Sequence, residues 1–203
     1  MVEDGNPVYD SRDNCNAIIE TSTNTMVNAC KTTIIPNTVT AIGDDVLFAI
    51  PGLTTVVIPN NVISLGETNI YGTDDFEGGD DIQTVVIGNS LTAIGNYCFS
   101  YCHNLRDLYC YAPNLPNAKI GYYVFRKLND VTLHVLSEYM DAYKDFADRY
   151  AFKLVAISDD DPNPTGIKRI TINEKVSVYD LNGREVKTPH KGIYIQNGRK
   201  VVY

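Results

Sequence analysis

The sequence predicts an α/β solenoid, a right-handed superhelix in which short strands and helical turns stack coil upon coil. Three observations predict it: a nine-residue phrase recurs, apolar positions recur with it, and glycine closes each copy. The phrase reads IPNTVTAIG at 35–43, IPNNVISLG at 58–66 and IGNSLTAIG at 87–95. Such internal self-similarity is the signature of a stacked array. We therefore expect one continuous core that successive coils share.

Each coil begins with a short β-rich segment, at 53–59, 82–88 and 105–111, and continues into the phrase or its equivalent. Apolar residues alternate in these segments, which predicts strands with one inward face. The inward residues expected there are Val56, Ile58, Val85, Ile87, Leu108 and Cys110. The phrase adds Val39 and Ile42, Val62 and Leu65, and Leu91 and Ile94. A single coil cannot bury these side chains, so their burial depends on neighbouring coils.

Proline and glycine are expected to separate the pieces of each coil. Pro36 and Pro59 lack an amide donor and should end the strand before them. The closing glycine should allow a backbone conformation that other residues resist. Four residues later each coil has one more apolar residue, in the order Leu47, Ile70, Phe99 and Phe125. A short helical turn is predicted there, because the segment DDVLFAI lacks Gly and Pro.

Residues 137–150 predict a helix that caps the last coil, and FKLVAI after it predicts a strand. Ser137 is a suitable N-cap residue. The residues that share one face of this helix are Met140, Tyr143, Ala147 and Tyr150. A cap is expected because the last coil would otherwise expose its core.

The chain divides into three parts by composition. Residues 1–157 are the repeat domain, with a special N-terminal module at 1–30 and regular coils and cap at 31–157. The acidic segment 158–164 contains two prolines and predicts a linker. Residues 165–203 alternate apolar and polar residues around two Asn-Gly pairs, Asn182-Gly183 and Asn197-Gly198. This pattern predicts two hairpins in a small β domain.

Charge is distributed unevenly along the chain. Up to Leu105 there are 13 Asp and Glu against 2 Lys and Arg, whereas from Thr165 onward there are 3 against 8. The acidic body argues against nucleic acid, which requires basic grooves, and allows basic protein partners or cations. Solubility alone also explains the acidic charge.

Apolar runs are too short to span a membrane, and the first twenty residues contain no signal peptide.

The five cysteines predict no metal site. A hairpin turning at Ser22-Thr23 would set Cys15 opposite Cys30, so a disulfide is one alternative and two buried thiols are the other. Cys98, Cys102 and Cys110 lack a fourth zinc ligand, so core thiols are favoured.

The acidic cluster at 72–81 is interpreted as a solvated loop, and the one at 159–161 as part of the linker, rather than as calcium sites. His103, His134 and His190 stand in three different segments, so no nucleophile is set beside a base. No Gly-rich phosphate loop precedes a helix. The sequence therefore predicts neither an enzyme nor a cofactor.

A candidate binding surface follows from the strand alternation. If Val56 and Ile58 point inward, Val57 points outward, and stacking places its equivalents beside it. The outward column then consists of Ile34, Val57, Val86, Tyr109 and His134, with Tyr111 next to it. Tyrosine is favoured in recognition, so a protein or glycan is expected to dock near Tyr109. Strand propensity alone also explains the aliphatic members.

The L/I/V spacing over roughly 20–29 residues is that of leucine-rich repeats. The wording IPNTVTAIG…F, and NPVYDSRDNCNAIIETSTNTMVNACKTTIIPN at 6–37, resemble the BspA-like leucine-rich-repeat family of bacterial surface proteins. That resemblance covers about residues 6–157. One departure is Cys98 before Phe99, where the family usually has Ala. The stretch VYDLNGREV…GIYIQNGRKVVY is similar to the C-terminal sorting domain of Bacteroidetes proteins exported by the type IX system.

These resemblances imply an exported protein of a Bacteroides-like bacterium, outside the cell or at the outer-membrane surface. They imply a non-enzymatic, monomeric binding or adhesion module for an extracellular protein or glycan of a host matrix or neighbouring cell. The alternatives are a structural spacer in a larger exported protein and a hydrolase with an unrecognised site. For the tail, the alternative to a sorting signal is a simple β appendage.

Overall fold

The computed structural model describes residues 2–3, 5–68 and 81–164, and the strand residues 178–179, 185–186, 193–196 and 199–202. The chain divides into two compact units, Met1–Lys168 and Arg169–Tyr203. Ile70 and the acidic insertion at 72–80 lie outside the described residues.

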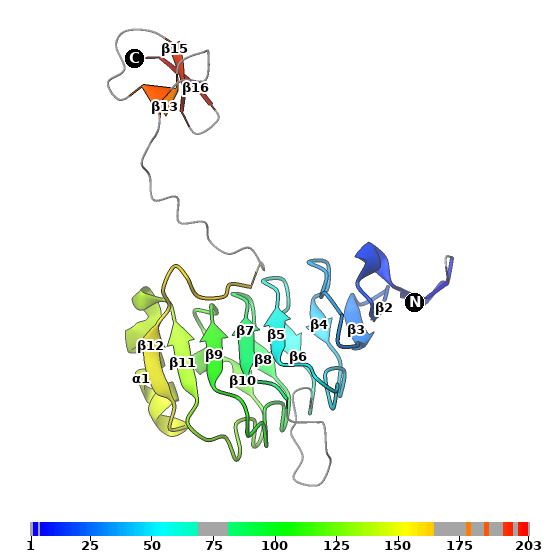
Figure 1. The fold of residues 1–203 in the computed structure, drawn as a ribbon. Coiled ribbons are helices and arrows are strands. Elements are labelled where there is room, and N and C mark those ends of the chain that lie inside the picture. The colour runs from blue at the N-terminus through cyan, green and yellow to red at the C-terminus, as the bar shows by residue number, and fades with distance from the viewer. Residues whose placement is uncertain are drawn as a thin grey trace. The chain divides into compact units, whose positions relative to one another are not determined.

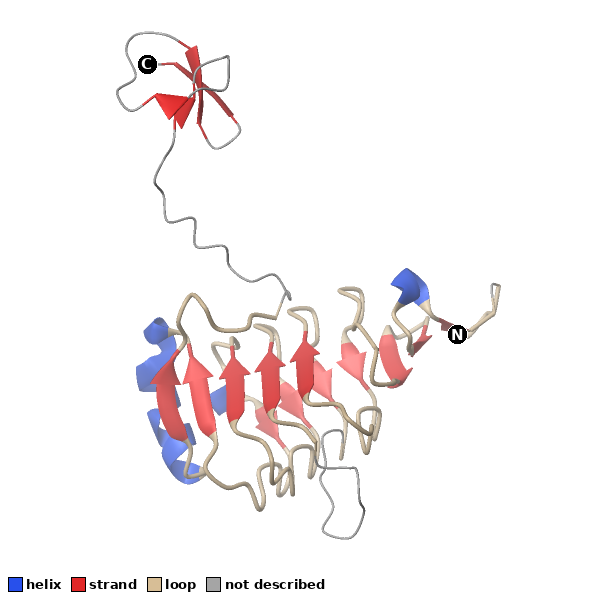
Figure 2. Ribbon diagram, viewed as in Figure 1, coloured by secondary structure: helices blue, strands red, loops and turns tan. Residues whose placement is uncertain are grey.

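The first unit consists of two rows of strands that stand back to back, with a helix at one end (Figures 1 and 2). One sheet is entirely parallel, in the order β12-β11-β9-β7-β5. Its strands are β5 (Thr55–Ile58), β7 (Thr84–Ile87), β9 (Asp107–Cys110), β11 (Thr132–Val135) and β12 (Lys153–Ala156). Successive coils pair residue for residue, which gives the array the predicted solenoid-like α/β fold.

The second sheet has the order β1-β2-β3-β4-β6-β8-β10. Its regular coils contribute two-residue strands, β4 (Ala41–Ile42), β6 (Ser64–Leu65), β8 (Ala93–Ile94) and β10 (Lys119–Ile120). The N-terminal module adds β1 (Tyr9–Asp10), β2 (Ile18–Glu20) and β3 (Thr25–Asn28). β3 pairs in parallel with β4, so the module continues the array.

The core lies between the two sheets, and the inward residues predicted from the repeat are buried. Ile58, Val62, Val85, Ile87 and Leu108 are each 0% exposed. The remaining members of the predicted set are also buried, namely Val39, Ile42, Val56, Leu65, Leu91, Ile94 and Cys110. Each fully buried aliphatic side chain contributes about 1.5–3 kcal/mol, so the repeated phrase supplies the core of every layer.

The predicted helical turn after the closing glycine is wrong in the copies that the structure describes, and the turn at Ile70 lies outside the described residues. Residues 44–49 and 96–101 form hydrogen-bonded turns instead of a helix. Two positions in each turn have a left-handed backbone, with φ of 58° and 50° at Asp45 and Ala49, and 57° and 61° at Tyr97 and Tyr101. A left-handed residue interrupts a right-handed helix, which explains the difference.

The closing glycines are required for a different reason than the sequence predicts. The described glycines with positive φ are Gly5 and Gly52, so the closing glycines do not adopt the left-handed conformation. A Cβ on Gly95 would instead lie 2.6 Å from the carbonyl carbon of Gly66, and one on Gly66 would lie 2.6 Å from that of Gly43. Successive coils touch through their backbones here, and no side chain fits between them.

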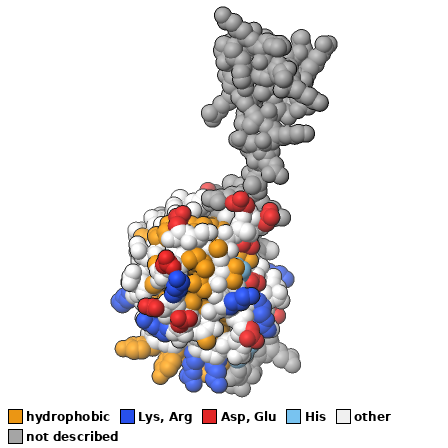
Figure 3. Space-filling model, turned by 90° about the vertical axis from the view of Figure 1, so that its left-hand side faces the viewer, with side chains coloured by type: hydrophobic (Ala, Val, Ile, Leu, Met, Phe, Trp, Pro, Cys, Tyr) orange, Lys and Arg blue, Asp and Glu red, His pale blue; other side chains and the backbone are white. Residues whose placement is uncertain are grey.

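The array ends in α1 (Met140–Arg149), preceded by a single 3₁₀ turn at Ser137–Tyr139. The helix and the strand after it are as predicted, but Ser137 is not the N-cap, because Leu136 takes that position for the 3₁₀ turn and Tyr139 for the helix. α1 buries Tyr143, Phe146 and Ala147. Figure 3 views this end of the array and shows hydrophobic side chains surrounded by charged ones of both signs.

The predicted hairpin in the N-terminal module is present, with Glu20 opposite Thr25 and Ile19 opposite Met26. An irregularity between Ile18 and Ile19 then shifts the register. Cys15 and Cys30 are free thiols, the first buried and the second exposed. The shift removes the direct pairing that a disulfide between them would need.

In the second unit, β13 (Val178–Tyr179) pairs antiparallel with β14 (Glu185–Val186), and β15 (Ile193–Gln196) pairs antiparallel with β16 (Arg199–Val202). β13 also pairs with β15, which joins the four strands into one sheet. Both Asn-Gly pairs lie outside the described residues. None of the described helices is long and apolar enough to cross a membrane.

Candidate binding surface of the parallel sheet

The predicted outward column exists in the register of the parallel sheet. Val57 pairs with Val86, Val86 with Tyr109, and Tyr109 with His134. Ile34 does not join them, because residues 31–36 form no strand and β5 ends the sheet. The column is therefore one position shorter than the sequence predicts.

Exposure along the column is uneven, which sequence alternation alone could not predict. Val86 is 0% and Tyr109 8% exposed, although both point away from the core, whereas Ile34 is 77% exposed. Val57 and His134 are half-buried. Ile34 is therefore the one fully exposed member of the predicted surface.

The segment that follows β12 covers the middle of this face. We call residues 157–164 the strap. In Figure 1 the strap leaves β12 and runs past the ends of β11 and β9. The Tyr109 hydroxyl donates to Asp161 at 3.4 Å, and the Tyr111 hydroxyl donates to the Pro162 carbonyl at 2.9 Å. Most of the strap is the segment predicted as a linker, yet these contacts hold it against the sheet.

Asp161 fixes the conformation of the strap as well as its position. One of its carboxylate oxygens accepts hydrogen bonds from the amide of Ser158 at 2.7 Å and from its hydroxyl at 2.9 Å. The other oxygen faces Tyr109. Burial and the nearby charges of Asp161 and Asp107 raise the pKa of Tyr109 to about 12, so its hydroxyl remains a donor at neutral pH.

Tyr109 is also held from the side of β11. Its ring stacks on His134 with centroids 4.1 Å apart and planes 17° apart. The Nε2 atom of His134 lies 2.8 Å from a carboxylate oxygen of Asp107. These contacts give the middle of the sheet a closed, fully packed outer face.

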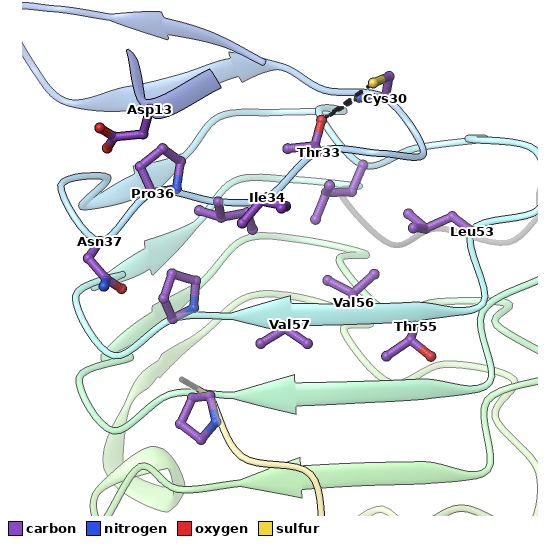
Figure 4. Close-up of a pocket in the computed structure, with 14 residues that line it drawn as sticks. Asp13, Cys30, Thr33, Ile34, Pro36, Asn37, Leu53, Thr55, Val56 and Val57 are labelled. Atoms are coloured by element: carbon purple, nitrogen blue, oxygen red, sulfur yellow. Dashed lines mark hydrogen bonds between the residues drawn. The ribbon is translucent and has the colours of Figure 1, made fainter. Parts of the chain in front are cut away.

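An apolar groove of about 480 Å³ opens where the strap ends, beside β5. Figure 4 shows the segment with Thr33, Ile34 and Pro36 on one side of it, and β5 with Val57 on the other. Its lining residues are Asp13, Cys30, Thr33, Ile34, Ile35, Pro36, Asn37, Leu47, Leu53, Thr55, Val56, Val57, Pro59 and Pro164. Among these described lining residues, Asp13 alone carries a formal charge.

The edge of β5 along this groove has no strand partner among the described residues. Parallel pairing with β7 uses the carbonyls of Thr54 and Ile58, which accept from Thr84 and Gly88. By the alternation of a parallel ladder, the amides and carbonyls of Thr55 and Val57 point the other way. The groove therefore combines an apolar lining with main-chain donors and acceptors that no described strand pairs.

Sequence reasoning missed both the strap and the groove. The spacing of Ser158 and Asp161 is typical of a local side-chain turn and could have predicted a folded strap. The groove arises because 31–36 departs from a strand although its wording matches the later coils. Nothing in its residue pattern indicates this departure.

The described residues do not bring together three or more His, Cys, Asp or Glu side chains that could hold a metal ion. Cys98, Cys102 and Cys110 are buried, and the Cys110 thiol lies 3.2 Å from the Tyr143 hydroxyl. Burial raises the pKa of Cys110 to about 11, which keeps its thiol protonated and unreactive.

Comparison with known protein families identifies the type of repeat. Six copies of the BspA type leucine rich repeat region match residues 17–153, which is most of the chain. Comparisons with curated proteins and with solved structures give no match. The match covers the regular coils, their cap helix and part of the N-terminal module. The chain belongs to the BspA-type leucine-rich-repeat family.

Proposed function

We propose that this chain is a non-enzymatic binding module, secreted or displayed at the cell surface, that takes up an extended segment of a partner protein along β5. The open edge of β5 beside an apolar groove is the observation that carries the proposal. Its leucine-rich repeats support a role in protein interaction.

An extended peptide is suited both to the open main chain of β5 and to the apolar lining of the groove. Its main chain would pair with the amides and carbonyls of Thr55 and Val57, the mode in which a partner adds a strand to a sheet. Its alternate side chains would contact the apolar lining, which includes Ile34 and Leu53. β5 has four residues, so pairing would span about 13 Å of partner chain.

Charge favours a basic segment. Asp13 is the one charged residue among the described lining residues, and the chain up to Leu105 has 13 acidic against 2 basic residues. A Lys or Arg close to Asp13 would experience attraction from that carboxylate and from the acidic surroundings. We therefore assign a partner segment with alternating apolar residues and at least one basic residue.

The proposed site lies at the exposed end of the predicted column instead of at the centre of the column. Ile34 and Val57 line the groove, whereas Val86 and Tyr109 are buried and Tyr111 bonds to the strap. Docking near Tyr109 would require the strap to leave. Binding at β5 requires no such rearrangement.

Selection from a displayed library of random heptapeptides tests the proposal. Enriched peptides should alternate apolar and polar residues and contain Lys or Arg. Ile34→Asp should weaken their binding by about tenfold or more, because it places a charge in the apolar groove. Val57→Pro should do the same by removing an edge donor, with its circular dichroism spectrum recorded alongside.

Ile63→Asp is the matched control, since Ile63 is 47% exposed and does not line the groove. It should leave affinity unchanged. Enrichment without alternation, or full affinity in Ile34→Asp, would remove the β5 edge as the site. If no peptide is enriched, the structural-spacer function becomes the better account.

Export and surface placement are part of the same proposal. They rest on the resemblance of residues 165–203 to a type IX sorting domain. Fusing these residues to a periplasmic reporter in a type IX-competent host should move the reporter to the cell surface. A reporter that stays in the periplasm would identify the tail as a simple β appendage.

A further inference from the structure

A second exposed surface lies on the turns of the last two regular coils. We call Tyr97, Tyr101, Tyr122, Tyr123 and Arg126 the tyrosine–arginine cluster. Tyr122 and Tyr123 are 77% and 58% exposed, the first as exposed as any large apolar side chain described. Arg126 is also exposed. The cluster does not line the groove at β5.

The cluster is a stack rather than a loose group of side chains. The rings of Tyr97 and Tyr123 lie 5.5 Å apart between centroids, with planes at 27°. The guanidinium of Arg126 lies 5.3 Å from the ring centre of Tyr123 and 5.6 Å from that of Tyr101. Stacking of this kind limits the motion of each side chain, so little conformational entropy remains to be lost on binding.

The backbone beneath the stack shows that the fold does not require tyrosine there. Tyr97 and Tyr123 have φ of 57° and 55°, a conformation unfavourable for bulky residues. Asp45 and Thr68 occupy the equivalent position, two residues after the closing glycine, with φ of 58° and 48°. Because smaller side chains serve this position in the earlier coils, its tyrosines indicate a role at the surface.

Arg126 is a cation without a carboxylate partner among the described residues. Residues 101–127 contain 4 Lys and Arg against 1 Asp, in a chain whose net charge is -8. Figure 3 shows Lys and Arg side chains gathered with hydrophobic ones at the lower rim of the capped end. Such a basic, aromatic patch in an acidic chain selects for an anion.

We propose that the tyrosine–arginine cluster binds an anionic polysaccharide. The exposed ring of Tyr122 offers a flat apolar surface to the face of a sugar ring. The Arg126 guanidinium, held over Tyr123, offers its forked donors to a carboxylate or sulfate of the same polymer. Carboxylate and sulfate share this chemistry, and the experiment separates them.

Isothermal titration of the whole chain with four polymers tests the proposal: polygalacturonate, heparin, neutral dextran and polyglutamate. Polygalacturonate binding identifies a carboxylate ligand, and heparin binding a sulfate ligand. Dextran should not bind, because it lacks the anion. Polyglutamate should bind at least about tenfold more weakly than the better polysaccharide, because it lacks the sugar ring. Affinity should fall as salt concentration rises.

Two variants and one control localise the site. Tyr122→Ala and Arg126→Gln should each weaken binding by about tenfold or more. Lys144→Gln makes the same charge change on the exposed side of α1 and should have no effect. Tyr122 is too exposed for its truncation to unfold the protein, and circular dichroism would verify this.

Three results would overturn the assignment. If dextran bound as tightly as the anionic polysaccharides, Arg126 would have no role in recognition. If polyglutamate bound as tightly as they do, the ligand would be an acidic protein instead of a glycan. Full affinity in both variants would place binding elsewhere. Ile34→Asp, which disables the proposed groove at β5, should leave polysaccharide binding unchanged, so the two proposals succeed or fail separately.

Discussion

The Tyr109 hydroxyl lies 3.4 Å from the Asp161 carboxylate, a contact that joins β9 to the strap across 52 residues of sequence. Asp161 is at the same time the acceptor for the amide and hydroxyl of Ser158. One carboxylate therefore shapes the strap and fastens it to the sheet. Loss of this group should release the segment without unfolding the array.

Replacement of Asp161 by alanine tests that role. Asp161→Ala removes all three hydrogen bonds and should lower the free energy of unfolding by about 1–3 kcal/mol. Hydrogen exchange in residues 157–164 should accelerate several-fold, which mass spectrometry of that peptide measures. Asp160→Ala, at an exposed neighbouring residue, is the control. Equal protection in both variants would mean that Asp161 does not hold the strap.

Two closing glycines should respond differently to the same substitution. The Cβ of Gly95→Ala would lie 2.6 Å from the amide nitrogen of Glu67, so the coils must separate. The Cβ of Gly43→Ala would lie 3.3 Å from the Met26 carbonyl oxygen, which a small shift relieves. Gly95→Ala should therefore destabilise the protein by at least about 2 kcal/mol more in chemical denaturation. Equal effects would disprove the backbone-contact explanation.

Ile94 tests the register of the core. It is 2% exposed, so Ile94→Ala should lower the free energy of unfolding by about 2–5 kcal/mol through the cavity it leaves. Ile63→Ala is the matched control at 47% exposure and should lower it by less than about 1 kcal/mol. Urea denaturation measures both. Similar losses for the two variants would contradict the assigned inward face.

Acid should weaken the N-terminal module through Asp10. Hydrogen bonds from Arg12 lower the pKa of Asp10 from 3.8 to about 2. A lowered pKa means that the stabilisation is present above pH 3.8 and disappears as the pH falls toward 2. In the wild-type protein the free energy of unfolding should fall by about 1 kcal/mol over this pH range, once solvent screening is taken into account. Asp10→Asn should lack this part of the pH dependence, whereas Asp160→Asn should retain it.

Alkali should act on the strap through Tyr109. The pKa of this phenol is raised from 10.0 to about 12, so its contribution to stability is complete below pH 10 and is lost as the pH rises toward 12. Stability measured across this interval should therefore fall less in Tyr109→Phe than in wild type. Tyr122→Phe, at an exposed residue, should follow wild type. Identical curves for wild type and Tyr109→Phe would rule out this coupling.

The inward positions could be predicted because the same apolar pattern recurs in several coils. Val39, Val62 and Leu91 occupy equivalent places in successive coils, and each is buried. The turns could not be predicted in the same way, because Asp45 and Tyr97 share a left-handed backbone despite different chemistry. Conformation there follows from coil stacking and not from the residue type.

The candidate surface was only partly predictable for a related reason. Strand alternation correctly placed Val57, Val86 and Tyr109 in one column. Whether an outward residue is exposed depends on what covers it, and the strap comes from far along the chain. Likewise, Ile34 carries the repeat pattern but lacks strand pairing, since the module before it replaces a regular coil.

The glycine contacts have a consequence for how such an array grows. A Cβ added to Gly66, Gly95 or Gly121 would lie 2.6–2.7 Å from the carbonyl carbon of the closing glycine one coil earlier, so successive coils meet here through their main chains. The junction between neighbouring coils therefore repeats the same glycine contact, and the side-chain bonds beside it, from Asp44 to the Glu67 amide and from Asn96 to the Tyr122 amide, also reach main-chain atoms of the next coil. A gene segment that encodes one coil can be duplicated or deleted in frame, and the new neighbours meet through an identical joint. Array length can thus change by recombination, while the outer residues of each coil diverge independently.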